Sequence, residues 1–225
     1  MMITVYVISI IVGLFSNIVI WVFSLLFCFR SYNPSYLRAF PLYATLALGT
    51  EAIVMSFTGF RHFFSGDYAP TNIPYNFFTL FELIFFSYFF TKVIISKKAK
   101  TLVLSMCAFF SIVFLILLLK YGANNRGGGP MTLLESIILV IPCFIYFREL
   151  FKRPRTFNLA KEPSFWIVTA ILFSFSIMIP IMLFVFYFGK CNMPNVCCGI
   201  YSFNNYSNII TNVVFIKGFT CRIKK

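Results

Sequence analysis

Acidic residues are scarce in this chain. Its 225 residues include six Asp and Glu, against 19 Lys and Arg, and only one histidine. Asp67 is the only aspartate and lies in a polar stretch, so a membrane protease with two catalytic aspartates is excluded. With His62 alone and no Cys-x-x-Cys, the ligand spacing of a structural zinc site is also missing. We therefore expect no metal site and no cofactor.

Common catalytic motifs are missing as well. The chain contains neither His-Glu-x-x-His nor Gly-x-Ser-x-Gly. The glycine run at 127–129 is not followed by Gly-Lys-Ser/Thr, so it is not a phosphate-binding loop. We therefore do not expect an enzyme.

Apolar residues dominate what is present. They make up 60% of the chain and charged residues only 11%, whereas a soluble domain has roughly 25% charged residues. Apolar stretches long enough to cross a bilayer recur along the whole length. This pattern predicts an all-α polytopic membrane protein that forms one transmembrane domain over residues 1–225. The seven expected spans cover about residues 2–29, 40–60, 75–95, 101–119, 131–147, 164–188 and 201–219.

The first apolar stretch, 2–29, contains no charged residue. A signal peptide is the alternative interpretation, but it would begin with a basic residue and have a shorter apolar region. Because no Lys or Arg precedes Arg30, we expect a retained first helix.

The basic residues alternate between the two sides of the predicted spans. One side receives all of the 19 Lys and Arg except Arg61, Lys120, Arg126 and Lys190. The positive-inside rule then places the N-terminus outside and the C-terminus in the cytoplasm, which requires an odd number of spans. Because the excess positive charge lies beside the predicted spans, we expect it to interact with the lipid bilayer and not with nucleic acid.

Three glutamates fall inside predicted spans: Glu51, Glu82 and Glu135. A charge at the centre of a bilayer costs at least ~3 kcal/mol on insertion scales, so such residues usually face the bundle interior. Glu82 and Glu135 also follow a threonine at capping-box spacing, which offers a structural alternative for both. For Glu51 the alternative is a protonated carboxyl that is hydrogen-bonded to a neighbouring helix.

The last span is the most polar. Asn204, Asn208 and Asn212 are spaced four residues apart and share one helical face. They either bond neighbouring helices or line a cavity with the glutamates. The candidate polar cavity is therefore Glu51, Glu82, Glu135, Asn204, Asn208 and Asn212.

Three cysteines lie in the stretch 189–199, which we expect to be a short loop on the outer face. Disulfides persist outside the cytoplasm, so Cys191 is expected to pair with Cys197 or Cys198.

Three stretches resemble an uncharacterised family of small seven-helix membrane proteins of Bacteroidetes-type bacteria. They are 75–90, 162–167 and the tail from Asn204, with Asn-Ile-Ile-Thr-Asn and Phe-Thr-Cys-Arg-Ile-Lys-Lys. The resemblance implies a multi-pass protein of the bacterial inner membrane. A G-protein-coupled receptor is a weaker alternative, because there is no Asp-Arg-Tyr after 75–95 and no Asn-Pro-x-x-Tyr in 201–219.

Two functional classes remain open. One is a sensor or transporter of a small molecule or ion, with an outward-facing polar cavity. The other is a structural or accessory membrane subunit without its own ligand. A sensor with such short loops would need an unidentified protein partner, and the sequence does not name a ligand.

Overall fold

The computed structural model describes residues 2–29, 34–64, 72–121, 128–152, 159–190 and 194–221. Within these ranges every regular element is a helix, which confirms the all-α prediction. Two short 3₁₀ helices, η1 (Ser35–Ala39) and η2 (Leu159–Lys161), precede α2 and α6. The seven α-helices are α1 (Met2–Cys28), α2 (Phe40–Phe64), α3 (Asn72–Val93), α4 (Lys97–Tyr121), α5 (Gly128–Phe151), α6 (Pro163–Lys190) and α7 (Pro194–Thr220).

Helices α1 to α6 are long and apolar enough to cross a membrane. Their outward faces carry large exposed apolar side chains, for example Phe15 on α1 and Phe109 and Leu119 on α4. Apolar surface of this extent is a hallmark of lipid contact. Helix α7 has 27 residues but is not among the six, and it carries the asparagines of the last predicted span.

Helices α3, α5 and α7 begin earlier than the sequence predictions placed them. Helix α5 begins at Gly128, so Glu135 lies two turns inside the helix and cannot complete a capping box at its start. Helix α3 begins at Asn72, and Glu82 is likewise interior. Helix α7 begins at Pro194, so Cys197 and Cys198 lie in helix where we expected a loop. In each case the helix extends into residues that the composition marked as polar or glycine-rich.

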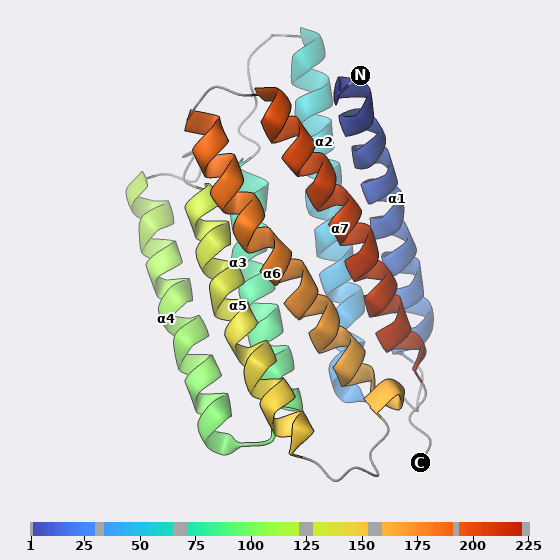
Figure 1. The fold of residues 1–225 in the computed structure, drawn as a ribbon, viewed down its shortest axis with the longest axis vertical. Helices are drawn as coiled ribbons and strands as arrows, with labels where there is room; N and C mark the ends of the chain where they lie inside the picture. Colours follow the sequence, from blue (N-terminus) through green and yellow to red (C-terminus); the bar gives the residue numbers. More distant parts are fainter. Residues whose placement is uncertain are drawn as a thin grey trace.

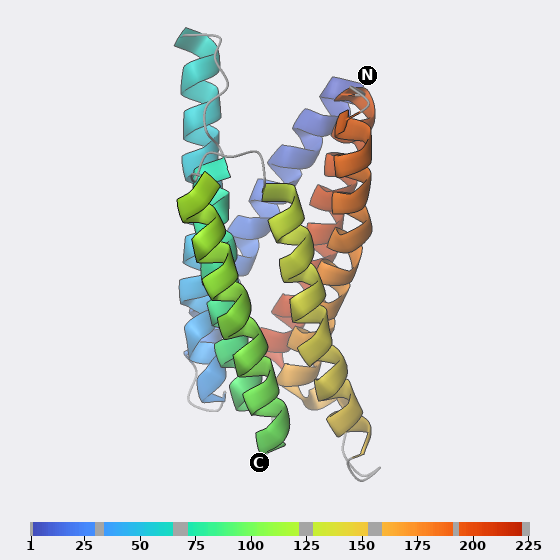
Figure 2. The same ribbon diagram turned by 90° about the vertical axis from the view of Figure 1, so that its left-hand side faces the viewer.

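The helices run alternately up and down (Figures 1 and 2). We call the end where α1, α3, α5 and α7 begin the upper end, and the opposite end the lower end. Helices α1 and α7 run in parallel side by side, so the start of α1 and the end of α7 lie at opposite ends of the bundle (Figure 1).

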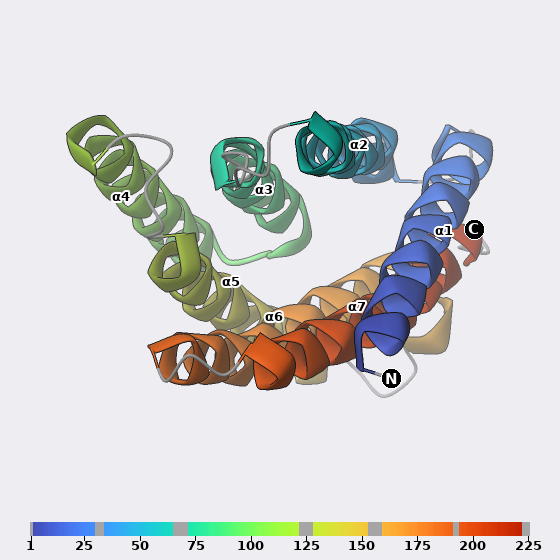
Figure 3. The same cartoon turned by 90° about the horizontal axis from the view of Figure 1, so that it is seen from above.

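Seen from above, six helices form a closed ring in the order α1, α2, α3, α5, α6, α7 (Figure 3). Helix α4 lies outside the ring against α3 and α5 (Figure 3). A ring of this kind places the inward side chains of α2, α3 and α5 near one another, although α5 is not the neighbour of α3 in sequence.

Phenylalanines fill the inside of the ring. Phe40 of α2 makes edge contacts with Phe85 of α3 at 5.1 Å and with Phe219 of α7 at 5.3 Å between ring centroids. Phe86 of α3 meets Phe175 of α6 at 5.9 Å. Such aromatic contacts join helices across the ring, and their side chains fill its interior.

Candidate functional site

The site begins with a hydrogen bond between α2 and α3. The Tyr43 hydroxyl donates to Glu82 Oε1 at 2.6 Å. Tyr43 lies in the first turn of α2, and Glu82 lies about 15 Å along α3 from its start at Asn72. A tyrosine hydroxyl inside an apolar bundle needs a partner, and the carboxyl provides it.

Glu135 contributes a second carboxyl, which is buried and interacts electrostatically with Glu82. Its side chain comes from α5 and is only 1% exposed. It accepts a hydrogen bond from Thr79. Thr79 and Glu82 are three residues apart, so α3 presents both on one face toward α5.

One oxygen of this pair has no partner. Glu135 Oε1 is fully buried and forms no hydrogen bond. A buried carboxylate oxygen without a donor is costly, and native structures rarely leave one in that state. Protonation of this carboxyl, or a cation bound to it, would satisfy the oxygen.

No basic side chain balances the two carboxyls. Among the described residues, the interactions of Glu82 and Glu135 involve Tyr43, Thr79 and each other, and no Lys, Arg or His. Two negative charges that interact in a low-dielectric interior repel each other. Protonation of one carboxyl, or a bound cation, would relieve this repulsion.

The surroundings of the pair are aromatic. Tyr43 stacks on Phe85 at 4.9 Å and also contacts Phe86 and Phe78. The rings of Phe40 and Phe89 pack below it, toward the lower end. The site is thus enclosed on its lower side, and Glu82 itself keeps partial exposure.

Glu51 forms a second tyrosine–glutamate hydrogen bond at the same interface between α2 and α3, which we call the α2–α3 seam. The Tyr75 hydroxyl of α3 donates to Glu51 Oε2 of α2 at 3.3 Å. Because α2 and α3 are antiparallel, this bond lies about 11 Å above the Tyr43–Glu82 bond. Tyr75 is 40% exposed and Glu51 half-buried, so exposure decreases from this upper bond down to Glu135.

The asparagines of α7 lie elsewhere. Asn212 Nδ2 donates to Ser16 Oγ at 2.9 Å and to Asn17 Oδ1 at 3.0 Å, both on α1. Asn205, which was not among the candidates, donates to Ser9 Oγ at 3.1 Å. The seven-residue spacing of the two asparagines matches that of the two serines on the parallel helix. Asn204 and Asn208 are half-buried, and the structure does not join them to the glutamates.

The cysteines contribute no described site. Cys191 and the side chains of Cys197 and Cys198 lie outside the described residues, so their pairing stays a prediction. Cys28, Cys107, Cys143 and Cys221 are free thiols. Within the described part of the chain, no group of three His, Cys, Asp or Glu could hold a metal ion.

Sequence reasoning missed Tyr43 as the partner of Glu82, and it associated Thr79 with Glu82 and not with Glu135. The available signal was polar hydroxyls within apolar spans, each of which requires an acceptor. Comparison with known proteins gives no further guidance, because no family model, curated protein or solved structure matches the chain. The resemblance to a Bacteroidetes-type family therefore stays a prediction.

Proposed function

We propose that this chain is a multi-pass membrane protein that binds a proton or a small monovalent cation at Glu82 and Glu135, as a transporter or a sensor and not as an enzyme. The observation that carries the proposal is Glu135 Oε1, which is buried and unpartnered beside a second carboxyl. Ionisable residues within membrane helices commonly mark ion pathways and proton relays.

The polar residues along the α2–α3 seam indicate from which end an ion would reach the glutamates. The two tyrosine–glutamate bonds of the seam form a polar column from Tyr75 toward Glu135. The lower side is filled by phenylalanines. We therefore infer that the site exchanges its ion with the upper end.

The proposal includes the orientation of the chain. In this orientation the chain crosses the bacterial inner membrane with α7 as a seventh span. The start of α1 lies outside and the end of α7 lies in the cytoplasm. This orientation places the upper end, and thus the access route, outside.

A structural or accessory subunit is the second candidate. The bonds of Asn205 and Asn212 to α1 favour it, because these polar residues join α7 to α1. In that case the glutamate pair would serve the same purpose, and an unidentified partner protein would supply the function.

A flux measurement separates the two candidates. The protein is reconstituted in liposomes with a pH gradient, and proton movement is recorded on addition of Na⁺ or K⁺. We expect Glu82→Gln and Glu135→Gln to abolish flux while the protein stays folded, because glutamine keeps the shape and removes the charge. Glu82→Leu should also lower thermal stability.

Glu162→Gln, at the lower end of the bundle, is the matched control and should keep wild-type flux. If the wild-type protein moves or binds no ion, and both glutamine variants are as stable as wild type, the accessory role is favoured.

A further inference from the structure

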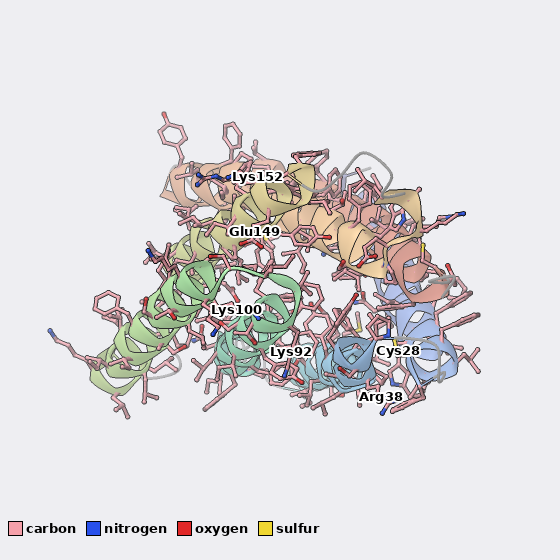
Figure 4. The ribbon with its side chains drawn as sticks, turned by 90° about the horizontal axis from the view of Figure 1, so that it is seen from below. Cys28, Arg38, Lys92, Lys100, Glu149 and Lys152 are labelled. Atoms are coloured by element: carbon pink, nitrogen blue, oxygen red, sulfur yellow. The ribbon has the colours of Figure 1, made fainter. Side chains whose placement is uncertain are left out.

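The lower ends of α3, α4 and α5 carry a concentrated positive charge. Six basic residues form this set, which we call the basic rim: Lys92, Lys97, Lys98, Lys100, Arg148 and Lys152. Their side chains are exposed, except that Lys100 is half-buried. Figure 4, seen from below, shows Lys92, Lys100 and Lys152 around the connection between α3 and α4.

The rim surrounds one acidic residue, Glu149, whose charge offsets only one of the six positive charges. Glu149 accepts hydrogen bonds from the backbone N–H groups of Ile95 at 2.8 Å and Ser96 at 3.2 Å. Both of its oxygens are therefore used to fasten the α3–α4 connection to α5 (Figure 4). Among the described residues, no cation of the rim forms an ion pair with a carboxylate; Lys92 lies over the ring of Tyr88.

The start of α4 strengthens the positive potential. Lys97, Lys98 and Lys100 occupy its first turn, which contains no acidic residue. The N-terminus of a helix already carries a partial positive charge, so three lysines there are mutually unfavourable without an anion nearby.

Exposed apolar side chains lie within the same rim. Ile95 is 65% exposed and Phe151 is 72% exposed. Exposed apolar side chains do not contribute to binding soluble anions or nucleic acid. A membrane interface, in contrast, places apolar lipid chains and phosphate headgroups side by side. Clusters of basic residues directly beside spans recognise anionic lipids in this way.

We propose that the basic rim binds the headgroups of anionic phospholipids, with lipid chains against Ile95 and Phe151. This surface is independent of the glutamate pair. The lipid bound there neutralises the start of α4 and holds the α3–α4 connection at the membrane surface.

Lipid selection can be measured directly. The protein is reconstituted in nanodiscs with equal parts phosphatidylcholine and phosphatidylglycerol, and the lipids retained on release are identified by native mass spectrometry. We expect preferential retention of phosphatidylglycerol by the wild type. Lys98→Gln should reduce the preference about fivefold, and the triple change Lys97→Gln, Lys98→Gln and Lys100→Gln about a hundredfold.

Lys120→Gln, at the upper end, is the matched single-charge control and should leave the preference unchanged. Thermal unfolding in pure phosphatidylcholine checks that each variant folds. Equal retention of both lipids by the wild type, or wild-type retention by the triple variant, would overturn the proposal. So would displacement of phosphatidylglycerol by inorganic phosphate at similar concentration, because the rim would then be a site for soluble anions.

Discussion

Tyr43 holds the Glu82 carboxyl in place from a neighbouring helix. Its hydroxyl is the only described hydrogen-bond donor to Glu82, at 2.6 Å, and its ring packs on Phe85 and Phe86. Removing the hydroxyl alone leaves the aromatic packing intact and withdraws the partner of a buried carboxyl.

We predict that Tyr43→Phe lowers the free energy of unfolding by about 1–3 kcal/mol, the usual cost of an unsatisfied buried polar group. Thermal unfolding in a defined detergent measures the loss. Tyr88→Phe is the control: Tyr88, on α3, is 46% exposed, and its change should stay within about 0.5 kcal/mol. An equal effect of both substitutions would contradict the role of Tyr43.

The sequence allowed part of this site to be predicted. Depth along a helix can be counted, so Glu51, Glu82 and Glu135 were recognisable as intramembrane carboxyls. Their pairing was not, because it depends on α5 packing beside α3, and sequence order does not reveal which helices become neighbours. The threonines that suggested capping boxes instead lie inside helices, where Thr79 serves Glu135 across the interface.

At the scale of elements, α6 and α7 pack closely at Gly218, near the lower end. A Cβ atom on Gly218 would lie 2.9 Å from Ile167 Cγ1 and 3.4 Å from the carbonyl oxygen of Pro163. Ile167 is fully buried and has little room to move. Small residues at such contacts let membrane helices pack closely.

We predict that Gly218→Ala destabilises the protein by about 1–3 kcal/mol through overpacking. Gly49→Ala is the matched control, since a Cβ there meets no atom within 4 Å and alanine favours the helix. Thermal unfolding of the two variants gives the comparison. A loss of stability at Gly49 equal to that at Gly218 would show that helix flexibility, and not the close contact, is responsible.

The contact between α1 and α7 depends on polar pairs. Asn212 and Asn205 each donate to a serine on α1, which explains how so polar a helix can lie in the bundle. The four-residue spacing of Asn204, Asn208 and Asn212 predicted a shared face, but the face that meets α1 is defined by Asn205 and Asn212. Spacing identifies candidate faces, and only packing selects among them.

We predict that Asn212→Leu destabilises the protein by about 0.6–2 kcal/mol, the range for hydrogen bonds between membrane helices. Asn208→Leu should have a smaller effect, because the structure gives Asn208 no polar contact with α1. Unfolding of the two variants under identical conditions provides the measurement. The reverse order would show that Asn208, and not Asn212, holds α7 in place.

At the scale of the whole molecule, α1 and α7 run in the same direction, so the start of α1 and the end of α7 lie at opposite ends of the bundle. From the asymmetry of basic residues we propose that the lower end faces the cytoplasm. We predict that reporter fusions after Lys100 and after Gly128 report opposite compartments, with the first in the cytoplasm. Fusions that report the same side would mean that α4 does not cross the membrane.

The central claim is that Glu82 and Glu135 share one proton or one cation inside the bundle. Infrared spectroscopy tests it most directly, because a protonated buried carboxyl has a carbonyl band that a carboxylate lacks. In cation-free buffer near neutral pH, we predict this band in the wild type, its loss or shift in both Glu82→Gln and Glu135→Gln, and no change in Glu162→Gln. Absence of the band in the wild type, or the same band in all four proteins, would contradict the account.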